Sequence, residues 1–156
     1  MATDSIIDGP YGGYGGQPYS ELHNNQKLKH VDAWGTSFAG YDVLGGIQFT
    51  WADGFQGPVI GREDANHYKA FDFDDDERIT KMTVYAGDGE GFVNGIHFET
   101  DNPKHKPFDV GSRIGKDNYP DLGNGEWIGA ESRNPAVAQD GGAQGVVDNI
   151  RLYFND

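Results

Sequence analysis

The chain of 156 residues contains no cysteine, which excludes disulfide bonds and thiol chemistry. It also lacks any apolar run of 18 residues, so we expect no insertion into a membrane. The first residues, Met-Ala-Thr-Asp-Ser, offer neither the basic region nor the long apolar stretch of a signal peptide. We therefore expect a cytoplasmic location, or export by a route that needs no signal peptide.

Basic residues are scarce, because 12 lysines and arginines stand against 25 aspartates and glutamates, for a net charge of −13. This charge opposes binding to nucleic acid or to anionic membranes. It also argues against sulfated or sialylated polymers, so we expect a neutral ligand. The five histidines lack metal-ligand spacing, and no Gly-x-Ser-x-Gly motif is present. We therefore predict no metal, no cofactor and no catalytic residue.

Helical periodicity is missing as well, since no stretch of ten residues has a convincing amphipathic pattern. Aromatic residues make up 13% of the chain, and 24 residues are glycine. This composition favours many short strands joined by tight turns. The length suits one domain that spans residues 1–156 and is large enough to bury a core.

Three segments of the chain are versions of one another, which indicates three copies of one unit. They span residues 42–51, 91–100 and 145–154. They align when Gly45 is matched to Asn94 and Asp148, and apolar and polar residues then alternate after that position. A period of two predicts a half-buried strand in each copy. Only the third copy has a carboxylate at the matched position, so we expect the copies to share a fold and not a function.

Each unit opens with another predicted strand, at residues 27–34, 77–85 and 126–130. A second hairpin follows the shared strand in units one and two, with a strand at 68–73. Unit three has no residues left for its second hairpin after Phe154, so residues 5–19 must supply it. The glycine-rich segment 9–16 should then lie beside the loop that precedes Asp148. That loop, residues 131–143, is the longest of the three, and long ordered loops are often functional.

The chain resembles the jacalin-related lectins of the mannose type over essentially its whole length. The likeness is carried by four segments: Gly-Pro-Tyr-Gly-Gly-Tyr-Gly-Gly at 9–16, Glu-Arg-Ile-Thr-Lys-Met at 77–82, Lys-Pro-Phe at 106–108, and Val-Asp-Asn-Ile-Arg-Leu-Tyr-Phe at 147–154. The resemblance implies an all-β fold, the β-prism I, in which three four-stranded Greek-key sheets surround a pseudo-threefold axis. It agrees with the three copies found from the repeats.

The resemblance also implies a sugar site between the glycine-rich loop and the loop before the last strand. The residues that correspond to it are Gly15, Gly16, Gly145, Val146, Val147 and Asp148, with Asp88, Gly89 and Glu90 on the bordering loop of unit two. One departure is that the position four before the aspartate is Gln144, whereas the family motif has glycine there. The family further implies a preference for mannose or glucose over galactose. Because we expect weak affinity at a single site, we also expect homo-oligomers that provide avidity.

The chemistry of these residues suits a neutral sugar without a metal ion. A carboxylate accepts hydrogen bonds from two vicinal hydroxyls, and such charge-assisted bonds are stronger than neutral ones. Backbone N–H groups of Val146 and Val147 would donate to the same oxygens, and glycine at the N-terminal loop allows close approach. We expect one site per chain, because the position of Asp148 is occupied by Gly45 and Asn94 in the other units.

Other interpretations remain open at this point. The glycine-rich segment could be a bulge or a flexible start, and Asp148 a simple turn residue. The same fold could serve as a structural or protein-interaction module. A glycosidase that pairs Asp148 with Glu90 or Asp88 is disfavoured, because nothing indicates a carboxyl group held protonated. We interpret the acidic run 72–77 and the basic run 104–106 as solvated turns, and Trp34, Trp51 and Trp127 as core or sheet-face residues.

Overall fold

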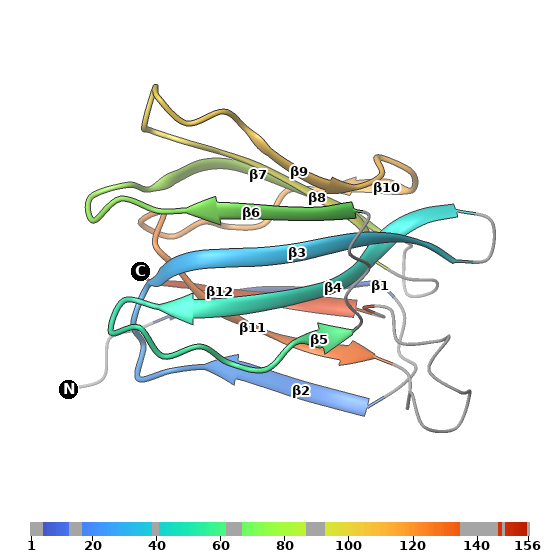
Figure 1. Ribbon diagram of the computed structural model, residues 1–156, viewed down its shortest axis with the longest axis horizontal. Coiled ribbons are helices and arrows are strands. Elements are labelled where there is room, and N and C mark those ends of the chain that lie inside the picture. The colour runs from blue at the N-terminus through green and yellow to red at the C-terminus, as the bar shows by residue number, and fades with distance from the viewer. Residues whose placement is uncertain are drawn as a thin grey trace.

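The computed structural model describes residues 5–12, 17–38, 41–61, 67–86, 93–134, 147 and 149–155. These residues form twelve β-strands arranged in three antiparallel sheets of four strands each (Figure 1). None of them belongs to a helix long and apolar enough to cross a membrane. The arrangement is the β-prism expected from the resemblance, and each predicted unit supplies one sheet.

The three sheets have the same strand order. The sheet of unit one contains, in order across it, β5 (Ile60–Gly61), β4 (Tyr41–Trp51), β3 (Leu28–Phe38) and β6 (Tyr68–Asp72). The sheet of unit two contains β10 (Lys116–Asn118), β7 (Ile79–Ala86), β8 (Val93–Thr100) and β9 (Phe108–Gly111). The sheet of unit three contains β1 (Ser5–Gly12), β12 (Asn149–Asn155), β11 (Trp127–Asn134) and β2 (Gln17–Leu22). In each case a central hairpin is flanked by the two strands of a second hairpin, which is the Greek-key connection.

The core lies between the sheets and is built from the alternating apolar residues of the shared strands. Their six inward side chains are at most 1% exposed: Ile47, Phe49, Ile96, Phe98, Ile150 and Leu152. Tryptophans close this core, since Trp51 and Trp127 are buried and each donates its indole N–H to a backbone carbonyl at 2.9 Å. Trp34 is buried on a sheet face, so the prediction for all three tryptophans is confirmed.

The matched position is a β-bulge in units one and two. In unit one Trp34 pairs with Gly46 and Gly35 pairs with Leu44, so Gly45 has no partner opposite it. In unit two the pairs Tyr85–Gly95 and Ala86–Val93 leave Asn94 in the same situation. The alignment of Gly45 with Asn94 is therefore confirmed. In unit three the matching pair is Arg133–Asn149, directly after position 148.

The N-terminal segment completes the sheet of unit three, as the missing hairpin predicted. Strand β1 runs antiparallel to β12 from the pair Ser5–Asn155 to the pair Gly12–Asn149, and β2 pairs with β11. The glycine-rich segment is thus strand as far as Gly12, with an irregularity between Asp8 and Tyr11 where Gly9 has a φ of 105°. Proline at position 10 fits this irregularity, because it has no N–H to donate to the ladder.

The long loop of unit three begins later than predicted. Strand β11 continues to Asn134, whereas the composition suggested a loop from residue 131 onward. The reason is that this segment pairs on both sides, with β12 through Arg133 and with β2 through the pair Asn134–Gln17. A sequence pattern shows neither partner, so it could not place this boundary.

Candidate functional site

Most of the predicted sugar site lies outside the described residues. This holds for eight of its nine members: Gly15, Gly16, Asp88, Gly89, Glu90, Gly145, Val146 and Asp148. The ninth, Val147, is described, as are the strand ends from which the other residues emerge.

The glycine-rich segment and the segment that leads to Asp148 both adjoin the strand pair β1 and β12. Gly12, the last residue of β1 before the glycine-rich loop, pairs with Asn149, which follows Asp148. On the other side of the sheet, the pair Gln17–Asn134 joins the start of β2 to the end of β11. The glycine-rich loop and the loop that leads to Asp148 therefore leave the same end of one sheet.

Val147 lies where the three sheets meet. Its side chain is fully buried and faces the core. Its carbonyl accepts a hydrogen bond from the N–H of Val93 at 3.1 Å, and its own N–H donates to the carbonyl of Leu44 at 3.3 Å. This N–H is thus used within the protein, whereas we expected it to serve a ligand. The contact with Val93 also brings the end of the 87–92 loop beside the residue that precedes Asp148.

The equivalent position in unit two is filled by the protein itself. The Asn94 side chain donates from Nδ2 to the carbonyl of Ile114 at 2.9 Å, and the Asn94 carbonyl accepts from the N–H of Ser112 at 2.8 Å. The fit is tight, because a Cβ added to Gly95 would lie 2.1 Å from the Ser112 carbonyl oxygen. The partner loop of unit two therefore packs directly on Asn94.

The equivalent position in unit one offers no polar side chain. A Cβ added to Gly45 would lie 2.8 Å from Cγ2 of Thr36, so the bulge packs against its own hairpin. The partner loop of this unit, residues 62–66, lies outside the described residues. Units one and two thus differ from unit three in the chemistry of the bulge position.

The acidic run contains a buried residue that the sequence analysis missed. Asp74, Asp75 and Asp76 are exposed, as expected of a solvated turn, but the side chain of Glu77 is completely buried. It accepts hydrogen bonds from the Thr100 hydroxyl at 2.5 Å and the Asp74 N–H at 2.8 Å, and it lies 2.7 Å from Nδ1 of His105. The interpretation as a solvated turn is therefore wrong for Glu77.

Asp74, Glu77 and His105 could together hold a metal ion, since their ligand atoms lie within 4.8 Å of one another. Both oxygens of Glu77 already accept hydrogen bonds that hold the two neighbouring turns together. We therefore assign this cluster a structural role. The Asp-x-x-Glu spacing was the one sequence signal that could have revealed it, because an acidic side chain commonly accepts from a backbone N–H three residues away.

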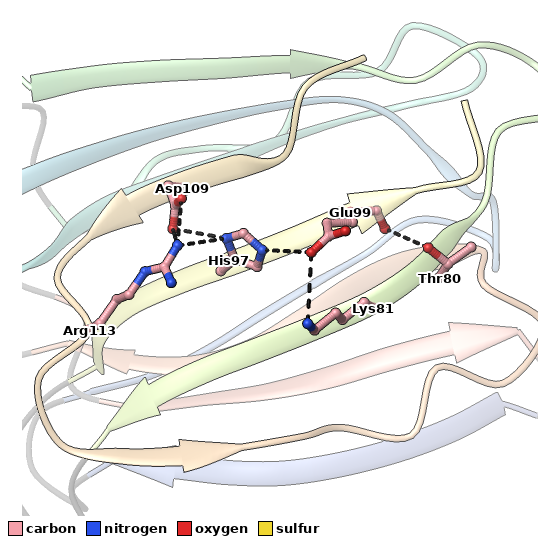
Figure 2. Close-up of polar contacts among 6 residues, drawn as sticks. All are labelled: Thr80, Lys81, His97, Glu99, Asp109 and Arg113. Carbon is pink, nitrogen blue, oxygen red and sulfur yellow. Dashed lines mark hydrogen bonds and ion pairs between the residues drawn. The ribbon is translucent and has the colours of Figure 1, made fainter. Parts of the chain in front are cut away.

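A network of charged groups crosses the outer face of the unit-two sheet (Figure 2). His97 is buried, with Nε2 lying 3.2 Å from Glu99 and Nδ1 lying 3.1 Å from Asp109. Arg113 binds Asp109 at 3.1 Å, and this hydrogen bond raises the pKa of Arg113. Figure 2 shows Lys81 reaching Glu99 from the neighbouring strand, at 3.9 Å. These contacts join β7, β8 and β9.

A second network lies on the outer face of the unit-one sheet. His30 stands between two carboxylates, 2.9 Å from Asp32 and 2.5 Å from Asp72. Burial lowers the pKa of His30, but the hydrogen bonds to Asp72 and Asp32 outweigh burial, so the pKa is raised overall. The Tyr68 hydroxyl also donates to Asp32, which raises the pKa of Tyr68 to about 12. This network joins β3 to β6.

Comparison with protein families gives a match to the jacalin-like lectin domain over residues 8–132. The match ends within β11, so it does not include the long loop or Asp148. A comparison with curated protein sequences gives no significant match.

Comparison with solved structures gives similar folds at low sequence identity. A lamprey immune protein has 20% identity and a TM-score of 0.76, and it covers the whole chain, which in turn spans 46% of the lamprey protein. A mannose-specific jacalin-related lectin from Morus nigra, solved with mannose, has 17% identity and a TM-score of 0.74, covering 99% of this chain and 97% of its own. A mannose-binding lectin from champedak has 18% identity and a TM-score of 0.73, covering 98% of both chains.

Proposed function

This chain belongs to the family of jacalin-like lectin domains, and from that premise we propose that it binds neutral glycans of the mannose or glucose type through one metal-independent site. Proteins of this family bind carbohydrate without transforming it, so the chain is a lectin and not an enzyme. Two structural neighbours at full coverage are described as mannose-specific or mannose-binding, which supports the choice of sugar.

The observation that carries this proposal is the pairing of Gly12 with Asn149. It brings the start of the glycine-rich loop and the residue after Asp148 to one point, although they are far apart in the sequence. The hydrogen bond from Val93 to Val147 places Val93, which follows residues 87–92 in the sequence, beside the residue that precedes Asp148. The described residues next to the three predicted parts of the site thus lie close together, which supports the proposal.

We propose that only unit three binds sugar. A carboxylate at position 148 accepts from two hydroxyls, whereas Asn94 is already bonded to Ile114 and Gly45 has no side chain. A calorimetric titration with methyl α-mannoside should therefore give one site per chain. Two or three equivalent sites would overturn this part of the proposal.

The substitution Asp148→Asn tests the site directly. It removes the charge from the acceptor, and a hydrogen bond to a charged group contributes about 1.5–3 kcal/mol. Because single-site affinity of such lectins is expected near ~1 mM, or about −4 kcal/mol, this loss should abolish measurable binding. The exposed Asp117→Asn serves as the matched control and should bind methyl α-mannoside like the native chain. Unchanged binding by a folded Asp148→Asn variant would refute the assignment.

The remaining expectations extend this proposal to the cell. We propose that homo-oligomers provide avidity, so a multivalent mannose glycoprotein should bind more tightly than the monosaccharide.

Neither nucleic acid nor membrane is expected as a partner, because the net charge of −13 opposes both. We retain the cytoplasmic or signal-independent location as a proposal. A glycan array that shows no binding by the folded protein would favour the alternative, a protein-interaction module on the same fold.

A further inference from the structure

A groove follows the seam between the sheets of unit one and unit two. It consists of two adjoining cavities of about 410 and 690 Å³, a size range that suits small-molecule ligands. The two cavities share Lys69 of β6 and Asp109 of β9 in their lining, so they form one elongated groove. In Figure 1, β6 lies between β3 and the sheet of unit two, which contains β9.

Both walls of the groove are strand edges with backbone groups available for hydrogen bonding. Strands β6 and β9 are the last strands of their sheets. The Phe73 N–H donates to the Lys29 carbonyl, so by the alternation of an antiparallel ladder Tyr68, Ala70 and Asp72 turn their backbone groups away from β3. In β9 the bond from Ser112 to Asn94 sets the same alternation. There, Asp109 and Gly111 turn their backbone groups away from β8.

The lysines of the groove form no ion pair with a described residue, whereas two of its three carboxylates do. The third, Asp42, accepts a hydrogen bond from the Ser37 hydroxyl at 3.3 Å. Lys69, Lys104 and Lys106 are exposed, and none forms an ion pair with another described residue. Asp109 already binds Arg113 and His97, and Asp72 binds His30. Three of the 12 basic residues of this acidic chain thus converge on one groove from two separate elements.

The lining favours an acidic sugar over other kinds of anion. Tyr68 borders the groove and is 49% exposed, and an exposed aromatic ring can pack against the apolar face of a pyranose. Backbone N–H and C=O groups beside it match hydroxyls, which both donate and accept. The net charge of −13 repels a long polyanion, but a single acidic group senses mainly the charges within a Debye length of about 8 Å.

We propose that this groove is a second carbohydrate site that binds a short oligosaccharide carrying a carboxylate. The carboxylate lies between Lys69, Lys104 and Lys106, and a neutral part of the glycan extends along β6 past Tyr68. The inference rests on the lectin assignment but uses none of the residues proposed to bind mannose. It also refines the expectation of a purely neutral ligand, which considered only the net charge of the chain.

A matched pair of sugars tests the groove in the Asp148→Asn background, where the mannose site is disabled. Methyl β-glucuronide and methyl β-glucoside differ only in the carboxylate, so the glucuronide should bind and the glucoside should not. In an NMR titration the amide signals of residues 68–72 and 104–111 should shift. Binding should weaken as salt is raised from about 50 mM to about 500 mM, because the charges are partly exposed.

A charge-matched pair of variants completes the test. The triple substitution Lys69→Gln, Lys104→Gln and Lys106→Gln should raise the Kd for the glucuronide about tenfold or more. The control Lys27→Gln, Lys29→Gln and Lys81→Gln removes the same charge elsewhere and should leave the Kd within about twofold. In the chain with Asp148 intact, the first variant should retain methyl α-mannoside binding.

Three results would overturn the proposal. The first is equal binding of glucuronide and glucoside, and the second is an equal loss in the control variant. The third is binding of a short acidic peptide as tightly as the glucuronide, which would assign the groove to acidic polypeptides. Loss of mannoside binding in Asp148→Asn with retained glucuronide binding would separate the two sites.

Discussion

The buried carboxylate of Glu77 is the hydrogen-bond acceptor or contact of three other groups. Its carboxylate accepts from the Thr100 hydroxyl and the Asp74 N–H and contacts His105, so Glu77→Ala leaves these groups without their acceptor. We expect the free energy of unfolding to fall by about 2–3 kcal/mol, measured by urea denaturation. The neighbouring, exposed Asp76→Ala should change it by less than about 0.5 kcal/mol. An equal effect of both substitutions would contradict the structural role of Glu77.

His30 gives the stability a dependence on pH. Its pKa is raised in the folded protein, so the folded state holds the proton more tightly than the unfolded chain does. The stabilisation is fully present below the unfolded pKa of about 6.5 and is lost as the pH rises through the raised folded value. His30→Gln should therefore lower the melting temperature more at about pH 5 than at about pH 9. An equal decrease at both pH values would show that the ion pairs with Asp32 and Asp72 contribute nothing.

The contacts of individual residues were the feature least predictable from the sequence. Trp34, Trp51 and Trp127 could be assigned to the core because large aromatic side chains are costly to expose. The contact of Glu77 with Thr100 and that of His30 with Asp72 could not be predicted, because these partners lie 23 and 42 residues away in the sequence and come from other strands. The sequence shows which residues are charged but not which of them come into contact.

At the scale of single elements, the bulge of unit two depends on glycine. A Cβ at Gly95 would lie 2.1 Å from the Ser112 carbonyl oxygen and 2.8 Å from that of Val110. Because both obstacles are backbone atoms, Gly95→Ala should destabilise the protein by about 3 kcal/mol in a thermal or urea unfolding experiment. Gly54→Ala is the control, since its positive φ costs about 1–2 kcal/mol but no atom lies within 4 Å. A smaller effect at Gly95 than at Gly54 would contradict the packing described here.

The strands themselves were largely predictable from the repeats. The period of two and the matched positions Gly45 and Asn94 predicted β4 and β8, whereas the bulge at each matched position was not predicted. The boundaries were less predictable, because a strand extends as far as it has partners. Strand β11 reaches Asn134 through its pairing with Gln17, which comes from the other end of the chain.

At the scale of the whole molecule, the loop between β11 and β12 is the feature that most distinguishes unit three. We predict that deletion of residues 135–139, which begins after the pairing of Asn134 ends, will change the order of preference among glycans. The affinity for the free monosaccharide should change less, since Asp148 lies beyond the deletion. Glycan arrays on both proteins provide the measurement. An unchanged order would assign the loop to another purpose and favour a protein partner.

The fold of the whole molecule followed from the sequence more completely than its site did. Three copies, with the last completed by residues 5–19, predicted the three sheets and the neighbouring ends of the chain. The site depends on loops, in which no periodic pattern constrains the backbone. The strand ends around Gly12, Val93 and Asn149 lie close together, and the arrangement of the site itself stays a prediction.

The pairing of Ser5 with Asn155 means that the polypeptide nearly closes into a ring at the end of the sheet opposite to Gly12 and Asn149. A short linker between these two residues, with a new opening in another connection, should give a circular permutant that still folds. The same geometry suits a domain inserted into, or fused to, another protein. Both connections would leave together from one end of the sheet, and the end with Gly12 and Asn149 would point away from the fused protein.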